Sequence, residues 1–184
     1  MRHAVGEGEH GSPEAPVSQP PSPPPAPTMV AASEGGLPLT TQRADLSLAL
    51  PQVAQAALRR VADPNDDSAQ HVYLNVEGLK ADHTPGISWE VHLNLPPDAG
   101  PEAGDHLVGV ISFFGFRRQL DPDSQEHGLG PMVHTFDITD LVQNLRDRGE
   151  WDDLAARVSF IPVGPNVEDM TARPRVGRVS ITFH

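Results

Sequence analysis

Apolar residues alternate with polar residues along several short segments in the second half of the chain, and this alternation constrains the fold most. The clearest example is the segment 87–95, in which every second residue is apolar and the intervening residues are Ser88, Glu90, His92 and Asn94. Successive side chains of a β-strand point to opposite faces. The segment is therefore predicted to be a half-buried strand with one face in water.

Other segments extend this pattern to a whole domain. Clusters of Gly, Pro and Asp separate them, as expected for turns. Residues 139–147 instead show helical spacing of apolar residues, with capping side chains at Asp137 and Asp140 and Gly149 behind the last turn. The predicted fold is mainly β: an antiparallel β-sandwich with one short connecting helix. The further strands are predicted at 72–76, 107–116, 132–138, 157–163 and 176–184, with Val158, Phe160, Val176, Val179, Ile181 and Phe183 as core residues.

The N-terminal part of the chain has a different composition. Residues 1–40 hold nine of the 20 prolines, including a nearly continuous run at 20–27. Proline lacks the backbone N–H and fixes φ, so 1–40 is predicted to be a disordered Pro/Gly-rich tail. Residues 41–69 are predicted to be a linker with a short helix that begins near Pro51 and docks on a neighbouring domain. The β-sandwich is assigned to 70–184. Apolar residues of the linker helix are Val53, Ala56, Ala57 and Val61.

Composition excludes several classes of protein. The chain has no cysteine, so disulfides and thiolate-bound metals are excluded. Its 25 acidic residues against 13 basic ones give a net charge of −12, which argues against a nucleic-acid partner. No segment has the roughly 20 apolar residues that cross a bilayer, so no membrane partner is expected. No secretory signal is recognised, and the expected location is the cytoplasm by default.

The nine histidines do not form a sequence motif for metal binding. His92 is predicted to lie on the water-exposed face of its strand. A small metalloenzyme remains an alternative if His83 and His106 converge with His92 in space. Two acidic segments are also candidates: 121–126 resembles an incomplete calcium loop and is interpreted as a solvated turn, and 150–153, which could supply paired carboxylates, is interpreted as a turn after the helix. No nucleophile elbow or phosphate-binding loop is present, so no catalytic, cofactor-binding or metal-binding residue is assigned.

The order of the strand motifs resembles the C-terminal β-sandwich domain of tyrosinases and plant-type polyphenol oxidases. The resemblance covers roughly 70–184, but Trp89-Glu90-Val91-His92 and Phe113-Phe114-Gly115-Phe116 depart from the family pattern. The motifs that carry it are Val72-Tyr73-Leu74-Asn75-Val76, Leu107-Val108-Gly109-Val110-Ile111-Ser112-Phe113, Phe136-Asp137-Ile138-Thr139-Asp140-Leu141-Val142-Gln143-Asn144-Leu145, Val158-Ser159-Phe160-Ile161-Pro162 and Val179-Ser180-Ile181-Thr182-Phe183.

The resemblance implies an accessory role. In the family, a dinuclear type-3 copper site lies in a separate helical domain, and the sandwich covers the entrance to that site. This chain is therefore expected to hold no copper, to be non-catalytic alone, and to cap a type-3 copper oxidase domain in cis or in trans. The residue that would fill the entrance is not identified. The alternative is a stand-alone sandwich that binds carbohydrate or calcium through its acidic loops.

The segment 107–116 is apolar on both faces, which a sandwich strand does not need. Leu107, Ile111 and Phe113 are predicted to point one way, and Val108 and Val110, with Phe114 and Phe116, the other. The second face is expected either to pack against the helix at 139–147 or to form a patch for a partner.

Overall fold

The structure is a computed structural model that describes residues 27–61, 70–113, 132–164 and 171–184. Most of the predicted tail and the acidic segment 121–126 lie outside these ranges. The described chain forms ten strands, two α-helices and a short 3-10 helix, η1. Their bounds are β1 Thr28–Ala32, β2 Leu37–Pro38, β3 Ala44–Ala49, α1 Gln52–Val61, β4 Val72–Leu79, β5 Ser88–Leu93, η1 Gly104–His106, β6 Leu107–Ser112, β7 Met132–Asp137, α2 Thr139–Asp147, β8 Ala155–Val163, β9 Arg175–Val176 and β10 Arg178–Phe183.

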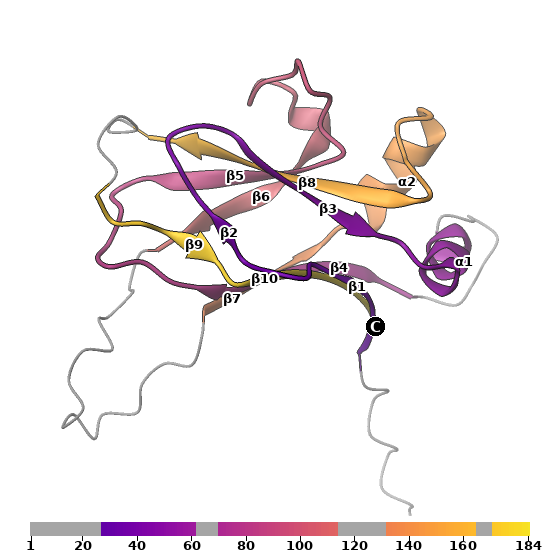
Figure 1. Ribbon diagram of the computed structural model, residues 1–184. Coiled ribbons are helices and arrows are strands. Elements are labelled where there is room, and N and C mark those ends of the chain that lie inside the picture. The colour runs from indigo at the N-terminus through magenta and orange to yellow at the C-terminus, as the bar shows by residue number, and fades with distance from the viewer. Residues whose placement is uncertain (1–26, 62–69, 114–131, 165–170) are drawn as a thin grey trace, which may run out of the picture.

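The strands form two four-stranded antiparallel sheets that face each other (Figure 1). One sheet has the order β1-β10-β4-β7 and the other β3-β8-β5-β6, and β2 pairs with β9 in a separate two-stranded ribbon. The predicted antiparallel β-sandwich is confirmed. Both α-helices lie at the same end of the sandwich, and the connection that carries η1 stands on the outer side of the β3-β8-β5-β6 sheet.

The core consists of the inward side chains of both sheets, and the pattern of alternation identified them. Trp89 is completely buried and makes an edge-to-face contact with Phe113, with 5.6 Å between ring centroids. The Trp89 indole Nε1–H donates to the carbonyl of Thr40 at 3.3 Å, so its polar atom is satisfied. All six core residues predicted on β8, β9 and β10 are buried.

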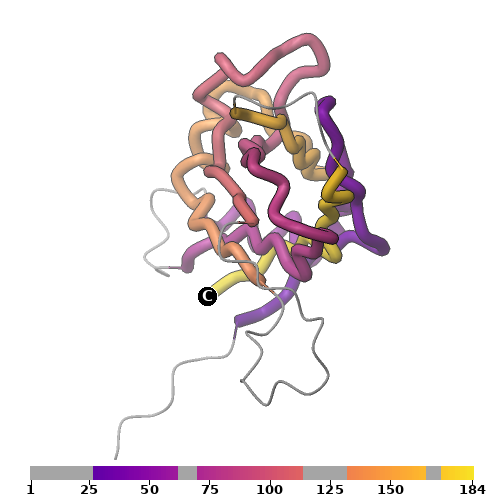
Figure 2. The backbone as a smooth tube through the Cα atoms, turned by 90° about the vertical axis from the view of Figure 1, so that its left-hand side faces the viewer, coloured from indigo at the N-terminus to yellow at the C-terminus, as the bar shows by residue number. Residues whose placement is uncertain are grey.

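The sandwich begins earlier than predicted, because β1 and β2 lie within the assigned tail and β3 within the assigned linker. β1 pairs with β10, with Thr28 opposite Phe183, so the start of β1 lies beside the C-terminus (Figures 1 and 2). β3 pairs with β8 along its whole length. β1 and β2 carry little local strand signal, and in β3 only Leu46 and Leu48 alternate with Asp45 and Ser47. Pairing with strands more than 100 residues away determines the structure of all three.

Both predicted helices are present, but the buried face of α1 differs from the prediction. Val53 is 76% exposed and Ala56 is also exposed, whereas Ala54, Leu58 and Val61 are buried. These three residues share one helix face, which packs towards α2 and β1. The docking is reinforced because the Gln143 side-chain amide of α2 donates to the Val61 carbonyl at 2.8 Å. In α2, Val142 and Leu145 are buried as predicted.

Candidate functional site

Three exposed apolar side chains lie on two neighbouring edge strands. β6 is the last strand of one sheet, β7 is the last strand of the other, and the two are in contact. Leu107 and Val110 of β6 are 40% and 48% exposed, and Val133 of β7 is 53% exposed. We call these three residues the β6–β7 apolar strip. Together they account for half of the large apolar side chains exposed in the described part of the chain.

The exposure of Leu107 corrects the prediction that it faces the core with Ile111 and Phe113. The last two are buried, as predicted. The pairing between β5 and β6 is irregular, however, because Val91 is opposite Gly109 and His92 is opposite Leu107. Val108 is therefore an extra residue of β6 without an opposite residue on β5. An extra residue reverses the alternation of side chains. Leu107 is therefore turned outwards.

The outer face of β6 is not covered by the helix at 139–147 in the described residues. α2 packs beside α1 and η1 at the end of the sandwich, where it buries Val142 and Leu145. Val110 keeps about half of its surface exposed. Of the two expectations for this face, the exposure favours a patch that could meet a partner.

His92 is completely buried, and the prediction of a water-exposed histidine is wrong. The connection that carries η1 lies over this face of the sheet (Figure 1). His92 Nε2 is 3.1 Å from Glu90 Oε2, while Nδ1 is buried without a hydrogen-bond partner among the described residues. His106 is also buried and its Nδ1 donates to the carbonyl of Leu93 at 2.9 Å, which fixes η1 on β5.

The three candidate histidines have separate partners. His83 Nε2 contacts the Thr171 hydroxyl at 3.2 Å. His92 instead contacts Glu90, and His106 contacts the carbonyl of Leu93. Within the described ranges, no group of three or more His, Asp and Glu side chains is arranged to hold a metal ion.

A polar network around a buried serine lies on the same outer face, and the sequence analysis did not identify it. Ser159 of β8 is completely buried, and its hydroxyl donates to Asp45 Oδ1 at 2.5 Å. The Arg43 guanidinium contacts Asp45 at 2.9 Å and Ser159 at 3.1 Å. It also donates to the carbonyl oxygens of Leu95, Pro96, Pro97 and Ala99. Arg43 therefore holds the connection between β5 and η1 on the sheet.

The acidic segment after α2 forms ion pairs that join the elements around it. Asp153 Oδ2 accepts from Arg59 of α1 at 2.8 Å, and Oδ1 accepts from Arg146 of α2 at 2.6 Å. The hydrogen bond from Arg59 and the charge of Arg146 hold the pKa of Asp153 below its usual value, against the effect of burial. Glu150 pairs with Arg148 at 2.9 Å. Glu150 and Asp152 line a small pocket of about 200 Å³.

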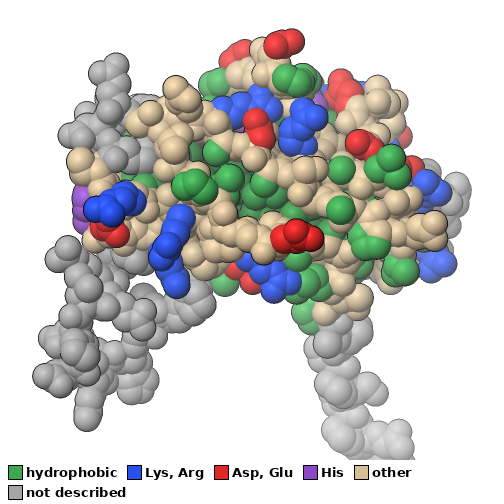
Figure 3. Space-filling view, in the orientation of Figure 1, with side chains coloured by type: hydrophobic (Ala, Val, Ile, Leu, Met, Phe, Trp, Pro, Cys, Tyr) green, Lys and Arg blue, Asp and Glu red, His purple; other side chains and the backbone are tan. Residues whose placement is uncertain are grey.

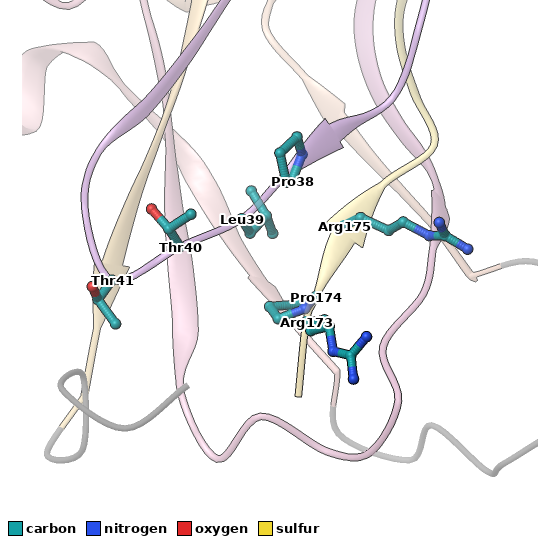
Figure 4. Close-up of a pocket in the computed structure, with 7 residues that line it drawn as sticks. All are labelled: Pro38, Leu39, Thr40, Thr41, Arg173, Pro174 and Arg175. Carbon is teal, nitrogen blue, oxygen red and sulfur yellow. The ribbon is translucent and has the colours of Figure 1, made fainter. Parts of the chain in front are cut away.

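A larger, open pocket of about 540 Å³ lies where β2 meets β9 (Figure 4). Its residues come from the end of β2 and the segment after it, and from the start of β9 and the segment before it. Two of them are arginines with exposed side chains. No carboxylate belongs to the lining, so the pocket does not offer the oxygen ligands that calcium requires. The lining residues are Pro38, Leu39, Thr40, Thr41, Arg173, Pro174 and Arg175.

Comparison with known protein families gives a match over nearly all of the described chain. Residues 26–184 match the family defined as a domain of unknown function (DUF7868). The chain belongs to this family. The start of the DUF7868 match at residue 26 agrees with β1 being the first strand of the sandwich. The structure contains no helix long and apolar enough to cross a membrane in its described part.

This DUF7868 chain is also similar to larger oxidases. It is 28% identical over 159 residues to a tyrosinase of Hahella sp.; the match covers 85% of the chain but only 32% of the tyrosinase. Among solved structures, latent aurone synthase (polyphenol oxidase) is 16% identical, with a TM-score of 0.47 over 79% of the chain and 25% of the synthase. Latent apple tyrosinase is 18% identical, with a TM-score of 0.48 over 79% and 27%.

The predicted resemblance to the C-terminal domain of the tyrosinase and polyphenol oxidase family is confirmed. The chain spans about a third of the length of the curated tyrosinase that it matches.

Proposed function

We propose that this chain is a non-catalytic accessory domain that docks on a type-3 copper oxidase domain and shields its active site. The observation that carries the proposal is the alignment of 85% of the chain with about a third of a tyrosinase. A segment of that size is large enough to fold as a domain of its own. Copper is expected only in the partner domain, which this chain would meet either in cis or in trans.

The β6–β7 apolar strip supplies a docking surface for this role. Exposed apolar side chains can mark contacts with partners, because covering them removes apolar surface from water. Val110 is opposite Glu90 and Val133 is opposite Glu77, so the two side chains project from the outer faces of different sheets. A partner seated on these neighbouring edge strands would therefore touch both layers of the sandwich. We propose that Val110 and Val133 lie at the centre of the contact with the oxidase domain.

The test uses the Hahella tyrosinase expressed without the segment that matches this chain. Purified chain is titrated into this copper-loaded enzyme while the oxidation of a diphenol is followed. The expected result is a saturable fall in rate, with a complex detected by size-exclusion chromatography. An unchanged rate together with no complex at high micromolar chain would refute the capping role.

A matched pair of variants locates the contact. Val110→Asp combined with Val133→Asp places two charges in the strip, and inhibition should be lost because the docked state would bury unpaired charges. Val53→Asp combined with Leu154→Asp is the control, since these side chains are 76% and 71% exposed outside the strip. Loss of inhibition in both variants alike, or in neither, would remove the strip from the docking surface.

Copper analysis tests the non-catalytic part of the proposal separately. The full chain is loaded with copper, dialysed, and measured for bound metal and for diphenol oxidation on its own. We expect both to be negligible. Stoichiometric copper after dialysis would contradict the proposal and would favour the small metalloenzyme alternative.

The open pocket at β2 and β9 bears on the alternative of a ligand-binding sandwich. Its arginines and threonines do not suit calcium, and it lacks the aromatic side chains on which sugar rings usually stack. Calcium should accordingly leave the thermal stability of the chain unchanged, because only a ligand that binds the native state raises it.

A further inference from the structure

Lys and Arg side chains lie at several places on the face seen in Figure 3, including the end that holds β2 and β9, and two arginines line the β2–β9 pocket. Lys80 and Arg175 are directly opposed across an antiparallel bridge. The Lys80 N–H donates to the Arg175 carbonyl at 3.0 Å, and the Arg175 N–H donates to the Lys80 carbonyl at 2.8 Å. Opposed residues of an antiparallel pair project their side chains to the same face. Two positive charges are therefore held side by side.

These two charges are not neutralised within the described part of the chain. No described residue forms a hydrogen bond or an ion pair with the side chain of Lys80 or of Arg175. Like charges placed directly opposite each other destabilise an antiparallel pair. Acidic residues outnumber basic ones by 25 to 13 in this sequence, so the pairing of two cations here is not a result of composition.

A third cation extends the group along the pocket. Arg173 contacts Asp82 at 3.2 Å, but the two side chains are 85% and 56% exposed, and such surface pairs contribute little. In the close-up, the side chains of Arg173 and Arg175 both extend away from Thr40 and Thr41 (Figure 4). We call Lys80, Arg173 and Arg175 the basic cluster.

The pocket beside the basic cluster has an apolar floor. Leu39 and Pro174 are buried, so the exposed Pro38, which is opposite Arg175, supplies the apolar surface that a ligand can reach. The planar guanidinium group of arginine matches the two oxygens of a carboxylate. An inorganic anion would use the charges but not the apolar surface. An extended peptide in which acidic and apolar side chains stand two residues apart would use both, because residues two apart point to the same side.

We propose that the basic cluster and the β2–β9 pocket bind an extended acidic peptide segment of a partner protein. Carboxylates of the segment pair with Arg175, Lys80 and Arg173, and an apolar side chain on the same side of the segment covers Pro38. The site belongs to this chain alone and lies on β2, β9 and the end of β4, apart from the β6–β7 apolar strip. It can therefore be tested without a copper domain.

The experiment measures the fluorescence anisotropy of a labelled peptide of repeating Glu-Ser-Leu-Ser, whose Glu and Leu side chains share one side, as the full chain is added. Binding is expected, and it should weaken as sodium chloride is raised, because salt screens exposed charges. Lys80→Glu combined with Arg175→Glu should weaken binding on the order of tenfold or more. Arg60→Glu combined with Arg157→Glu changes the net charge equally at exposed positions elsewhere and should leave the affinity unchanged. Circular dichroism verifies that both variants are folded.

A single substitution separates binding from stability. Lys80→Glu places opposite charges across the bridge, so the melting temperature should rise while peptide affinity falls. Failure of the peptide to bind, an affinity unaffected by the double substitution, or an equal loss in the Arg60/Arg157 control would each overturn the proposal. Displacement of the peptide by inorganic phosphate at the same concentration of negative charge would also overturn it, because the site would then bind oxyanions without using its apolar floor.

Discussion

Gly109 of β6 lies directly against the ring of Phe136 of β7, so that a β-carbon at position 109 would be 2.5 Å from Phe136 Cε1. This is much closer than a van der Waals contact. Phe136 in turn stacks on His134, with ring centroids 6.2 Å apart and 10° between the planes. The missing side chain at position 109 thus lets an aromatic ring close the sandwich where its two edge strands meet.

Replacement of Gly109 tests this contact. Gly109→Ala should lower the free energy of unfolding by about 1–3 kcal/mol, because the added methyl group displaces the Phe136 ring. Urea denaturation measures the change. Gly104→Ala is the matched control, since a β-carbon there meets no atom within 4 Å. Equal stability of the two variants would show that Phe136 moves aside without cost.

The contact between buried His92 and partly exposed Glu90 leads to a second prediction. Glu90→Ala should destabilise the chain by about 1–3 kcal/mol, because His92 would then have both ring nitrogens buried and unpaired. His92→Phe removes the buried polar atoms and keeps a ring of comparable shape, so it should cost less. Thermal unfolding of the two variants gives the order. A larger loss for His92→Phe would mean that the histidine ring makes contacts that phenylalanine cannot replace.

Arg43 is expected to control the connection between β5 and η1. Arg43→Lys retains the charge but cannot donate to four carbonyl oxygens at once, because an ammonium group lacks the planar array of donors. Amide hydrogen exchange should therefore become faster across residues 96–104, with the strands little changed. Arg60→Lys, on the exposed face of α1, serves as the control. Unchanged exchange across 96–104 would contradict the role given to Arg43.

Two carboxylates make stability depend on acid pH. Burial raises the pKa of Asp137, but hydrogen bonds from Thr139 and His71 outweigh it and hold the pKa below 3.8. The pKa of Asp153 is lowered by the hydrogen bond from Arg59. A carboxylate with a lowered folded-state pKa stabilises the native state above its unfolded pKa, and this contribution is lost as pH falls through the folded pKa.

The corresponding measurement is the free energy of unfolding of wild type and of Asp137→Asn combined with Asp153→Asn. The variant should be less stable at neutral pH, and its stability should fall less between about pH 5 and pH 2. The two curves should therefore converge in acid. Parallel curves over this range would show that the two carboxylates have the same pKa in the folded and unfolded chain.

The sequence predicted the later strands well because their pattern is local. Alternation at 87–95 located β5, and the core residues of β8 and β10 followed from the same rule. It failed for β1 and β3, whose partners are β10 and β8 at the far end of the chain. No residue within either short strand indicates which distant strand it will meet.

The candidate surfaces show the same limit. Cation positions can be read from the sequence, but only the bridge between Lys80 and Arg175 places two of them on one face. Likewise, Leu107 has the spacing of a core residue, and only the irregular pairing of β5 with β6 turns it outwards.

The sequence alone determined the class of fold, the absence of thiol chemistry and the acidic charge, because these depend on composition and on the two-residue period of a strand. The tertiary structure decided which polar side chains are buried. His92 and Ser159 are polar residues of alternating strands, yet both are completely buried. A second layer of chain, held by Arg43, covers the face that a single strand would leave in water. That covering arises from contacts between residues more than 50 positions apart, which no local pattern records.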